Sequence, residues 1–86
     1  MRDVEELRYR IKDLQDMWVE LCGQPGLQVH VEYRPTPGPR YWYLVHDDGS
    51  VETQGVANTD AEALEEAAER FTALVKAALR RSRRTA

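Results

Sequence analysis

Apolar residues recur every three or four positions near the start of the chain, which is the spacing of one face of an α-helix. The pattern predicts a helix over residues 3–22, with Asp3 as its N-cap and Glu6 at the capping-box position. Gly23 and Pro25 follow and end the predicted helix. Its core-facing stripe consists of Val4, Leu7, Ile11, Leu14, Trp18 and Leu21.

The same stripe also has the spacing of a heptad seam, so two interpretations stay open. The stripe packs inside its own domain, or it pairs with a second copy and forms a homodimer. The first interpretation is favoured because the stripe is short and Trp18 is bulky for a two-stranded seam. Cys22 is the only cysteine and ends this apolar region, so we expect a buried structural thiol.

Three strands are predicted from the middle of the chain. Residues 27–34 alternate strictly between apolar and polar side chains, which is typical of a strand with one face in water. The prolines in residues 35–39 lack N–H donors, so this segment is a connecting loop. Residues 40–47 are apolar on both faces, which favours a central strand. A hairpin turn at 47–49 then leads into a more polar strand at 50–57.

The remaining residues predict a second amphipathic helix. Thr59 and Glu62 have capping-box spacing, and the helical pattern continues to about residue 81. The basic tail, at about residues 80–86, is expected to fray. The order α-β-β-β-α predicts one α+β domain over residues 1–86, a three-stranded antiparallel sheet with two helices on one face.

Two helices on one face would leave the other sheet face open. Successive strand residues point to opposite faces, so Trp42 and Leu44 lie on one side of the second strand and the neighbouring tyrosines on the other. We expect Trp42 and Leu44 under the helices. If the tyrosines lie there instead, the open patch consists of Trp42, Leu44 and His46. Tyrosines on an open sheet are typical of binding surfaces, although ordinary cross-strand pairing is an equal alternative. The candidate partner-binding residues are Tyr41, Tyr43, His30, Glu32 and Arg34, and the acidic face of the second helix is the second choice.

Composition narrows the function classes. The net charge of −3 argues against nonspecific nucleic-acid binding by the whole domain. No apolar run is long enough for a membrane span, and the N-terminal residues lack a signal-peptide pattern, so we expect a cytoplasmic protein. No catalytic, metal-binding or cofactor-binding motif occurs, and we predict no enzyme activity, no metal and no cofactor. The alternative nucleic-acid contacts are Arg80, Arg81, Arg83 and Arg84.

The element order and several residues resemble the double-stranded RNA-binding domain. Gly38-Pro39 precedes an aromatic second strand, Gly55 ends the third strand, and residues 61–68 form an alanine-rich helix, as in that family. The family's RNA-gripping lysines at the start of this helix are replaced here by acidic residues, which would repel the phosphates. The resemblance therefore supports the fold and argues against the activity. The acidic residues are Asp60, Glu62, Glu65 and Glu66.

A second stretch is similar to HicB-type antitoxins. Thr53-Gln54-Gly55, Thr59 and Glu62-Ala63-Leu64 resemble the end of the sheet and the start of the helix in that family, and residues 40–43 resemble its aromatic strand. The gap between the glycine and the threonine is longer here, and the long first helix has no counterpart.

These observations predict a non-enzymatic protein-interaction module. It would be a small regulator or inhibitor, antitoxin-like or phage-encoded, that binds a larger protein partner and no membrane. The alternative is a nucleic-acid-binding domain of double-stranded RNA-binding type that uses Arg34, Arg40 and the arginine tail. A homodimer through the first helix or the open sheet face is a further alternative.

Overall fold

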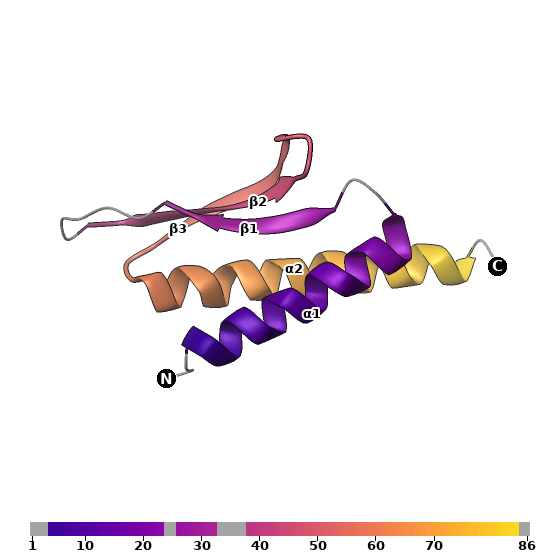
Figure 1. The fold of residues 1–86 in the computed structure, drawn as a ribbon, viewed down its shortest axis with the longest axis horizontal. Helices are drawn as coiled ribbons and strands as arrows, with labels where there is room; N and C mark the ends of the chain where they lie inside the picture. Colours follow the sequence, from indigo (N-terminus) through magenta and orange to yellow (C-terminus); the bar gives the residue numbers. More distant parts are fainter. Residues whose placement is uncertain (1–3, 24–25, 33–37, 85–86) are drawn as a thin grey trace.

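The computed structural model describes residues 4–23, 26–32 and 38–84 and has the predicted α-β-β-β-α order. Its strands form one antiparallel sheet in the order β1-β2-β3, and both helices lie on the same side of that sheet (Figure 1). The predicted fold class is confirmed. The elements are α1 (Val4–Cys22), β1 (Leu27–Val31), β2 (Arg40–His46), β3 (Val51–Ala57) and α2 (Asp60–Arg84).

The stripe of α1 packs inside its own domain. Trp18 meets Phe71 of α2 edge to face, with ring centroids 6.3 Å apart, a geometry that aromatic pairs prefer. Arg10 Nη2 donates a hydrogen bond to Thr72 Oγ1 at 3.1 Å and ties the two helices together. The predicted N-cap at Asp3 lies outside the described residues. The buried residues of α1 are Leu7, Ile11, Leu14 and Trp18.

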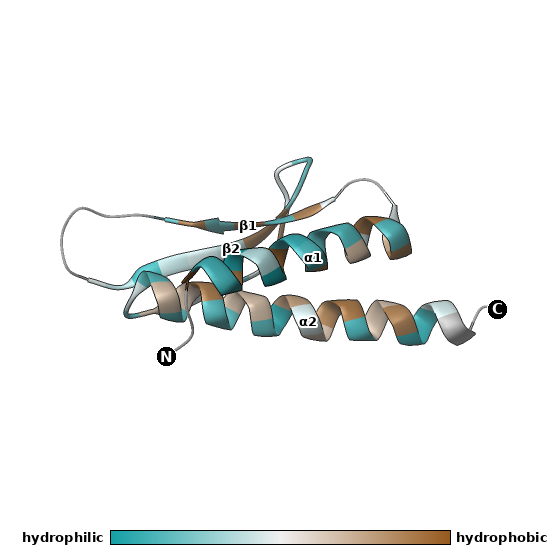
Figure 2. Ribbon diagram, turned by 60° about the horizontal axis from the view of Figure 1, so that its bottom comes forward, coloured by the Kyte–Doolittle hydropathy of each residue, from teal (hydrophilic) through white to brown (hydrophobic). Residues whose placement is uncertain are grey.

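The predicted cap of α2 is present. Thr59 Oγ1 accepts a hydrogen bond from the Glu62 N–H at 3.1 Å, and Glu62 in turn accepts one from the Asn58 N–H at 3.3 Å. The helix is described to Arg84, beyond its predicted end at about residue 81, and residues 85–86 of the predicted basic tail lie outside the described residues. Ala78 is buried and Leu79 packs against the core, which supports the helix this far along. Hydrophobic and hydrophilic residues alternate along both helices (Figure 2).

The hairpin between β2 and β3 has the predicted turn. The Gly49 N–H donates to the His46 carbonyl at 2.9 Å, and the His46 N–H donates to the Ser50 carbonyl at 2.8 Å. Gly49 has a φ of 91°, a conformation that glycine adopts without steric penalty. Asp48 Oδ1 accepts hydrogen bonds from both the N–H and the hydroxyl of Ser50. The two aspartates of this turn are thus turn residues, as predicted.

Beyond the turn, β3 contains a β-bulge. Val45 pairs with Val51, whereas the preceding residue of β2, Leu44, pairs with Thr53. Glu52 is therefore an extra residue on β3. Because partners across a ladder share a face, the bulge decides which β3 side chains point to the helices. The sequence pattern did not predict it.

Gly55 lies within β3 rather than at its end. The packing of Trp42 requires a glycine at this position. The two residues are partners in the ladder, and the Trp42 indole covers the glycine. A Cβ at position 55 would lie 2.4 Å from Cζ2 of that ring. The indole Nε1 also donates to Glu66 Oε1 of α2 at 3.4 Å. Glycine at this position therefore allows the largest buried side chain of the sheet to fit.

Candidate protein-interaction surface

The alternation of β2 places its residues as predicted. Trp42 and Leu44 are buried under the helices, with exposed fractions of 2% and 0%. Val31 and Val29 of β1 are their ladder partners and lie on the same face. Tyr41, Tyr43 and Val45 are half-buried and point to the opposite face, which no element of the described chain covers.

Two residues of β3 that the sequence analysis missed complete this open face. Val51 is paired with Val45 and Val56 with Tyr41, so both lie beside the predicted residues. Val51 and Val56 are 52% and 53% exposed, so both add apolar area to this face. No sequence signal identified Val56, because the bulge turns it outward and the sequence pattern does not predict the bulge. We call the set Tyr41, Tyr43, Val45, Val51 and Val56 the open-face patch.

Polar groups border the open-face patch. The rings of His30 and Tyr43 lie side by side across β1 and β2, with centroids 6.1 Å apart. The Glu32 N–H donates to the Tyr41 carbonyl at 2.9 Å, which holds Glu32 beside the patch although β1 ends one residue earlier. Arg34 lies outside the described residues. The structure thus brings together four of the five predicted binding residues, Tyr41, Tyr43, His30 and Glu32.

The patch is hollowed between its tyrosines and β3. A shallow depression of about 400 Å³ is lined by Tyr41, Tyr43, Gln54, Gly55 and Val56. These residues combine apolar ring and valine surface with the polar phenol and amide groups of the tyrosines and Gln54. Such a depression can receive an apolar side chain of another molecule and offer it hydrogen bonds at the rim.

The acidic face of α2, the second choice, is partly committed to the fold. Glu62 and Glu66 accept the hydrogen bonds from Asn58 and Trp42 described above. Asp60 Oδ1 accepts a hydrogen bond from Arg40 Nε at 2.9 Å and forms an ion pair with it. Glu69 is exposed and Glu65 half-buried. This surface remains acidic, but several of its carboxylates already have partners within the chain.

The arginines of the nucleic-acid alternative are dispersed. Arg40 is held by Asp60 and also donates to the Gly38 carbonyl at 3.0 Å. Arg80 and Arg81 are exposed near the end of α2, and Arg80 Nε donates to the Lys76 carbonyl at 3.4 Å. The side chains of Arg83 and Arg84 lie outside the described part of the chain. The described arginines therefore do not converge on one surface.

Cys22 is exposed, which corrects the expectation of a buried thiol. It is the last residue of α1, one turn beyond Trp18, the last buried residue of the stripe. At that level only Leu21 still packs partly against the core.

Within the described residues, no group of three or more His, Cys, Asp and Glu side chains could hold a metal ion. Neither α1 nor α2, over its described residues, combines the length and the apolar character needed to cross a membrane. No protein-family model matches the chain, and no curated protein or solved structure matches it.

Proposed function

We propose that this chain is a non-enzymatic protein-interaction module, a small regulator or inhibitor that occupies a larger protein through the open-face patch. The observation that carries the proposal is the uncovered, tyrosine-rich face of a sheet whose other face is filled by two helices. Apolar patches with polar borders mark interaction sites on small proteins.

The composition of the patch favours a folded protein as the partner. Tyr41 and Tyr43 offer ring surface at a low entropy loss, because each side chain has few rotatable bonds and stands on a hydrogen-bonded strand. The exposed Val51 and Val56 add apolar area beside them. His30 and Glu32 at the border can supply hydrogen bonds that fix the orientation of the partner.

The nucleic-acid alternative has weaker support. Arg40 would have to break its ion pair with Asp60 to reach a phosphate. The first turns of α2 expose carboxylates, which repel a phosphate backbone. A gel shift with duplex RNA and duplex DNA at two salt concentrations should therefore give no submicromolar complex at physiological salt. Such a complex, lost when Arg80 and Arg81 are neutralised, would replace the protein-binding proposal.

Photo-crosslinking tests the open-face patch directly. Tyr43 is replaced by a photoreactive phenylalanine analogue, and the matched control carries the same analogue at Tyr9, a tyrosine of α1 that is 67% exposed. We expect a distinct protein adduct in cells of the source organism from position 43 and none from position 9. The captured protein is then purified, and its affinity for the chain is measured by calorimetry.

Tyr43→Ala should weaken that measured affinity by about 2 kcal/mol, or about thirtyfold, which is typical of an interface hot spot. Tyr9→Ala should leave the affinity unchanged. The proposal fails if Tyr43→Ala lowers the melting temperature and leaves the affinity intact. It also fails if sedimentation at rising concentration reveals a dimer that buries the open-face patch.

A further inference from the structure

The sheet and the helical layer differ in width at the β1 edge. Two packed helices are about 20 Å wide, whereas three strands at a spacing of about 4.8 Å span about 14 Å. α2 lies close to all three strands, but α1 lies close only to β1 and α2 among the described elements. The excess width of the helical layer therefore falls beside β1, where α1 extends past the edge of the sheet.

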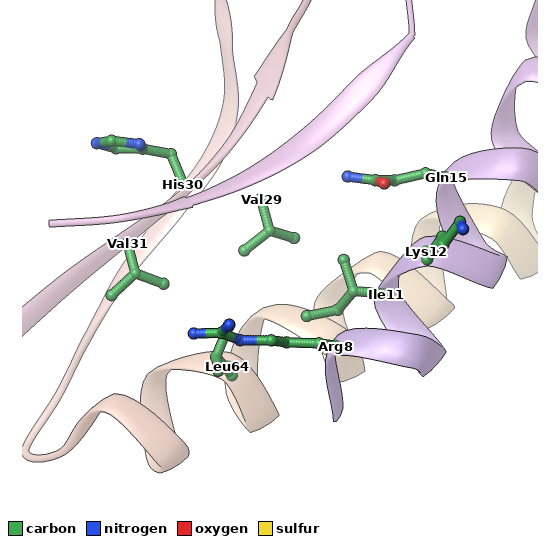
Figure 3. A pocket seen from close by; sticks show the side chains of 8 residues that line it. All are labelled: Arg8, Ile11, Lys12, Gln15, Val29, His30, Val31 and Leu64. Atoms are coloured by element: carbon green, nitrogen blue, oxygen red, sulfur yellow. The ribbon is translucent and has the colours of Figure 1, made fainter. Parts of the chain in front are cut away.

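A groove of about 400 Å³ occupies this place (Figure 3). Val29 and Val31 point from β1 toward the helices, and Arg8, Ile11 and Gln15 extend from α1 toward the strand. The floor is apolar, and the rim on the α1 side is polar and cationic. The groove is lined by Arg8, Ile11, Lys12, Gln15, Val29, His30, Val31 and Leu64.

The β1 backbone presents hydrogen-bonding groups along this groove. The Gly26 carbonyl and the Glu32 N–H bond to Asp47 and Tyr41 at the two ends of the β1–β2 ladder. In an antiparallel ladder, alternate residues point these groups toward the neighbouring strand. Residues 27, 29 and 31 therefore direct their N–H and C=O groups to the free edge, where no described strand pairs with them. Unpaired edge groups of this kind are a template for another strand.

The charge of the groove selects among possible occupants. Arg8 and Lys12 lie one turn apart on α1, both are exposed, and neither forms an ion pair with a described residue. The other exposed charged side chains of α1 are all carboxylates. They belong to Glu5, Glu6, Asp13, Asp16 and Glu20. The exposed cationic side chains of this helix, Arg8 and Lys12, thus line the groove, where they complement an acidic occupant.

A second copy of the chain fits this edge poorly. Pairing β1 with β1 about a two-fold axis would bring a second α1 into the space that the first α1 already overhangs. It would also place Arg8 and Lys12 opposite the same two cations of the other copy. An isolated extended segment has neither problem, since it needs only the width of one strand.

We propose that the groove between α1 and β1 binds an extended, acidic peptide segment of a partner protein, which pairs with β1 as a fourth strand. The segment turns apolar side chains onto Ile11 and Val29 and carboxylates toward Arg8 and Lys12. The groove shares only His30 with the border of the open-face patch, so the inference stands whether or not that patch binds a protein.

The probe is a blocked nonapeptide in which threonine alternates with glutamate and valine, Thr-Glu-Thr-Val-Thr-Glu-Thr-Val-Thr. It is titrated into the intact, isotope-labelled protein and followed by NMR. We expect shifts and slowed exchange at the amides of Leu27, Val29 and Val31, and no effect of Tyr43→Ala on the affinity. A counterpart peptide with lysine in place of glutamate should bind with an affinity at least about fivefold lower.

Backbone pairing is tested with two isomers of the probe, one N-methylated at the central threonine and one at the valine before it. Neighbouring residues of a strand point their N–H groups to opposite edges, so only one methyl group blocks the contact with β1. One isomer should therefore lose about tenfold or more in affinity, while the other retains it. Equal affinities would mean that the peptide does not pair as a strand.

The only two lysines of the chain provide a matched pair of protein variants. Lys12→Glu reverses a charge at the groove, and Lys76→Glu makes the same change on an exposed position of α2. Lys12→Glu should lower the affinity for the glutamate peptide about fivefold and raise the affinity for the lysine peptide. Lys76→Glu should change neither affinity. The inference is overturned if the probe does not bind, if its shifts map to the open-face patch, or if both variants behave alike.

Discussion

The two faces of the sheet are made from alternate residues of the same strands, yet only one of them is filled. Leu44 is fully buried against the helices, and its neighbour Val45 is half-buried on the open face. The inner face includes a tryptophan fitted over a glycine, whereas the outer face has tyrosines and exposed valines. The inner face is stabilised by close packing, whereas the outer face keeps apolar surface that can contact another molecule.

Removal of residues 1–22 should have the largest effect on stability, because it uncovers part of the filled inner face. Without α1, the inner face and the adjoining side of α2 would lose the cover of Leu7, Ile11, Leu14 and Trp18. Each buried large side chain contributes about 1.5–3 kcal/mol, and a small domain has about 5–15 kcal/mol in total. We expect no cooperative thermal unfolding of the truncated chain by circular dichroism. A cooperative transition would mean that the inner face does not need α1.

Substitutions at neighbouring positions of β2 compare the two faces directly. Leu44→Ala should lower the free energy of unfolding by about 2–5 kcal/mol, because it removes a buried side chain and leaves a cavity. Val45→Ala, its matched control on the open face, should lower it by about 1 kcal/mol or less. Urea unfolding measures both values. Similar losses would indicate that the open face is part of the packed core.

Gly55→Ala tests the fit between Trp42 and β3. The new Cβ would meet indole carbon atoms at 2.4 and 2.5 Å, so the ring or the strand must move. We expect a loss of about 1–3 kcal/mol in urea unfolding, the range for overpacked cores. Gln54→Ala changes the adjacent, exposed residue and should stay within about 0.5 kcal/mol of the natural chain. A neutral Gly55→Ala variant would refute the steric role of this glycine.

The smallest effect concerns the turn that sets the β2–β3 register. The hydroxyl and N–H of Ser50 stabilise the Asp48 carboxylate and hold its pKa below the ordinary value of 3.8. A lowered folded-state pKa stabilises the fold above pH 3.8, and this contribution is lost as the pH falls through the lower value. Ser50→Ala should raise the pKa of Asp48 toward 3.8, as followed by carboxyl-carbon NMR. An unchanged midpoint would exclude the hydroxyl as a cause.

The element order could be predicted because its signals are local. The three-and-four spacing of α1, the alternation of β1 and the Thr59 cap each lie within a few residues of one another. The same alternation placed Trp42 and Tyr43 on opposite faces but did not decide which face is covered; the structure has Trp42 inward and Tyr43 outward, as expected. The exposure of Cys22 was not predicted, because the point on α1 at which the core ends depends on the packing of the whole fold.

The β3 contribution to the open-face patch could not be predicted for a different reason. A regular ladder counted from the turn would point Thr53 and Gly55 outward and Val56 inward. The bulge reverses this, because the interior accepts only the glycine beside Trp42. That preference depends on a contact between residues of two strands and on α2 behind them. Periodicity along one strand contains no information about it.

The bulge also determines where β3 can vary in length. Loss of the codon for Glu52 would remove only the extra residue, and Thr53 would still pair with Leu44 in a plain ladder. Loss of the codon for Gln54 would instead turn the rest of the strand over and bring Val56 toward the indole. Two single-codon deletions only two positions apart would thus have opposite consequences. The first would leave the fold intact and could be inherited, whereas the second would prevent folding and be eliminated by selection.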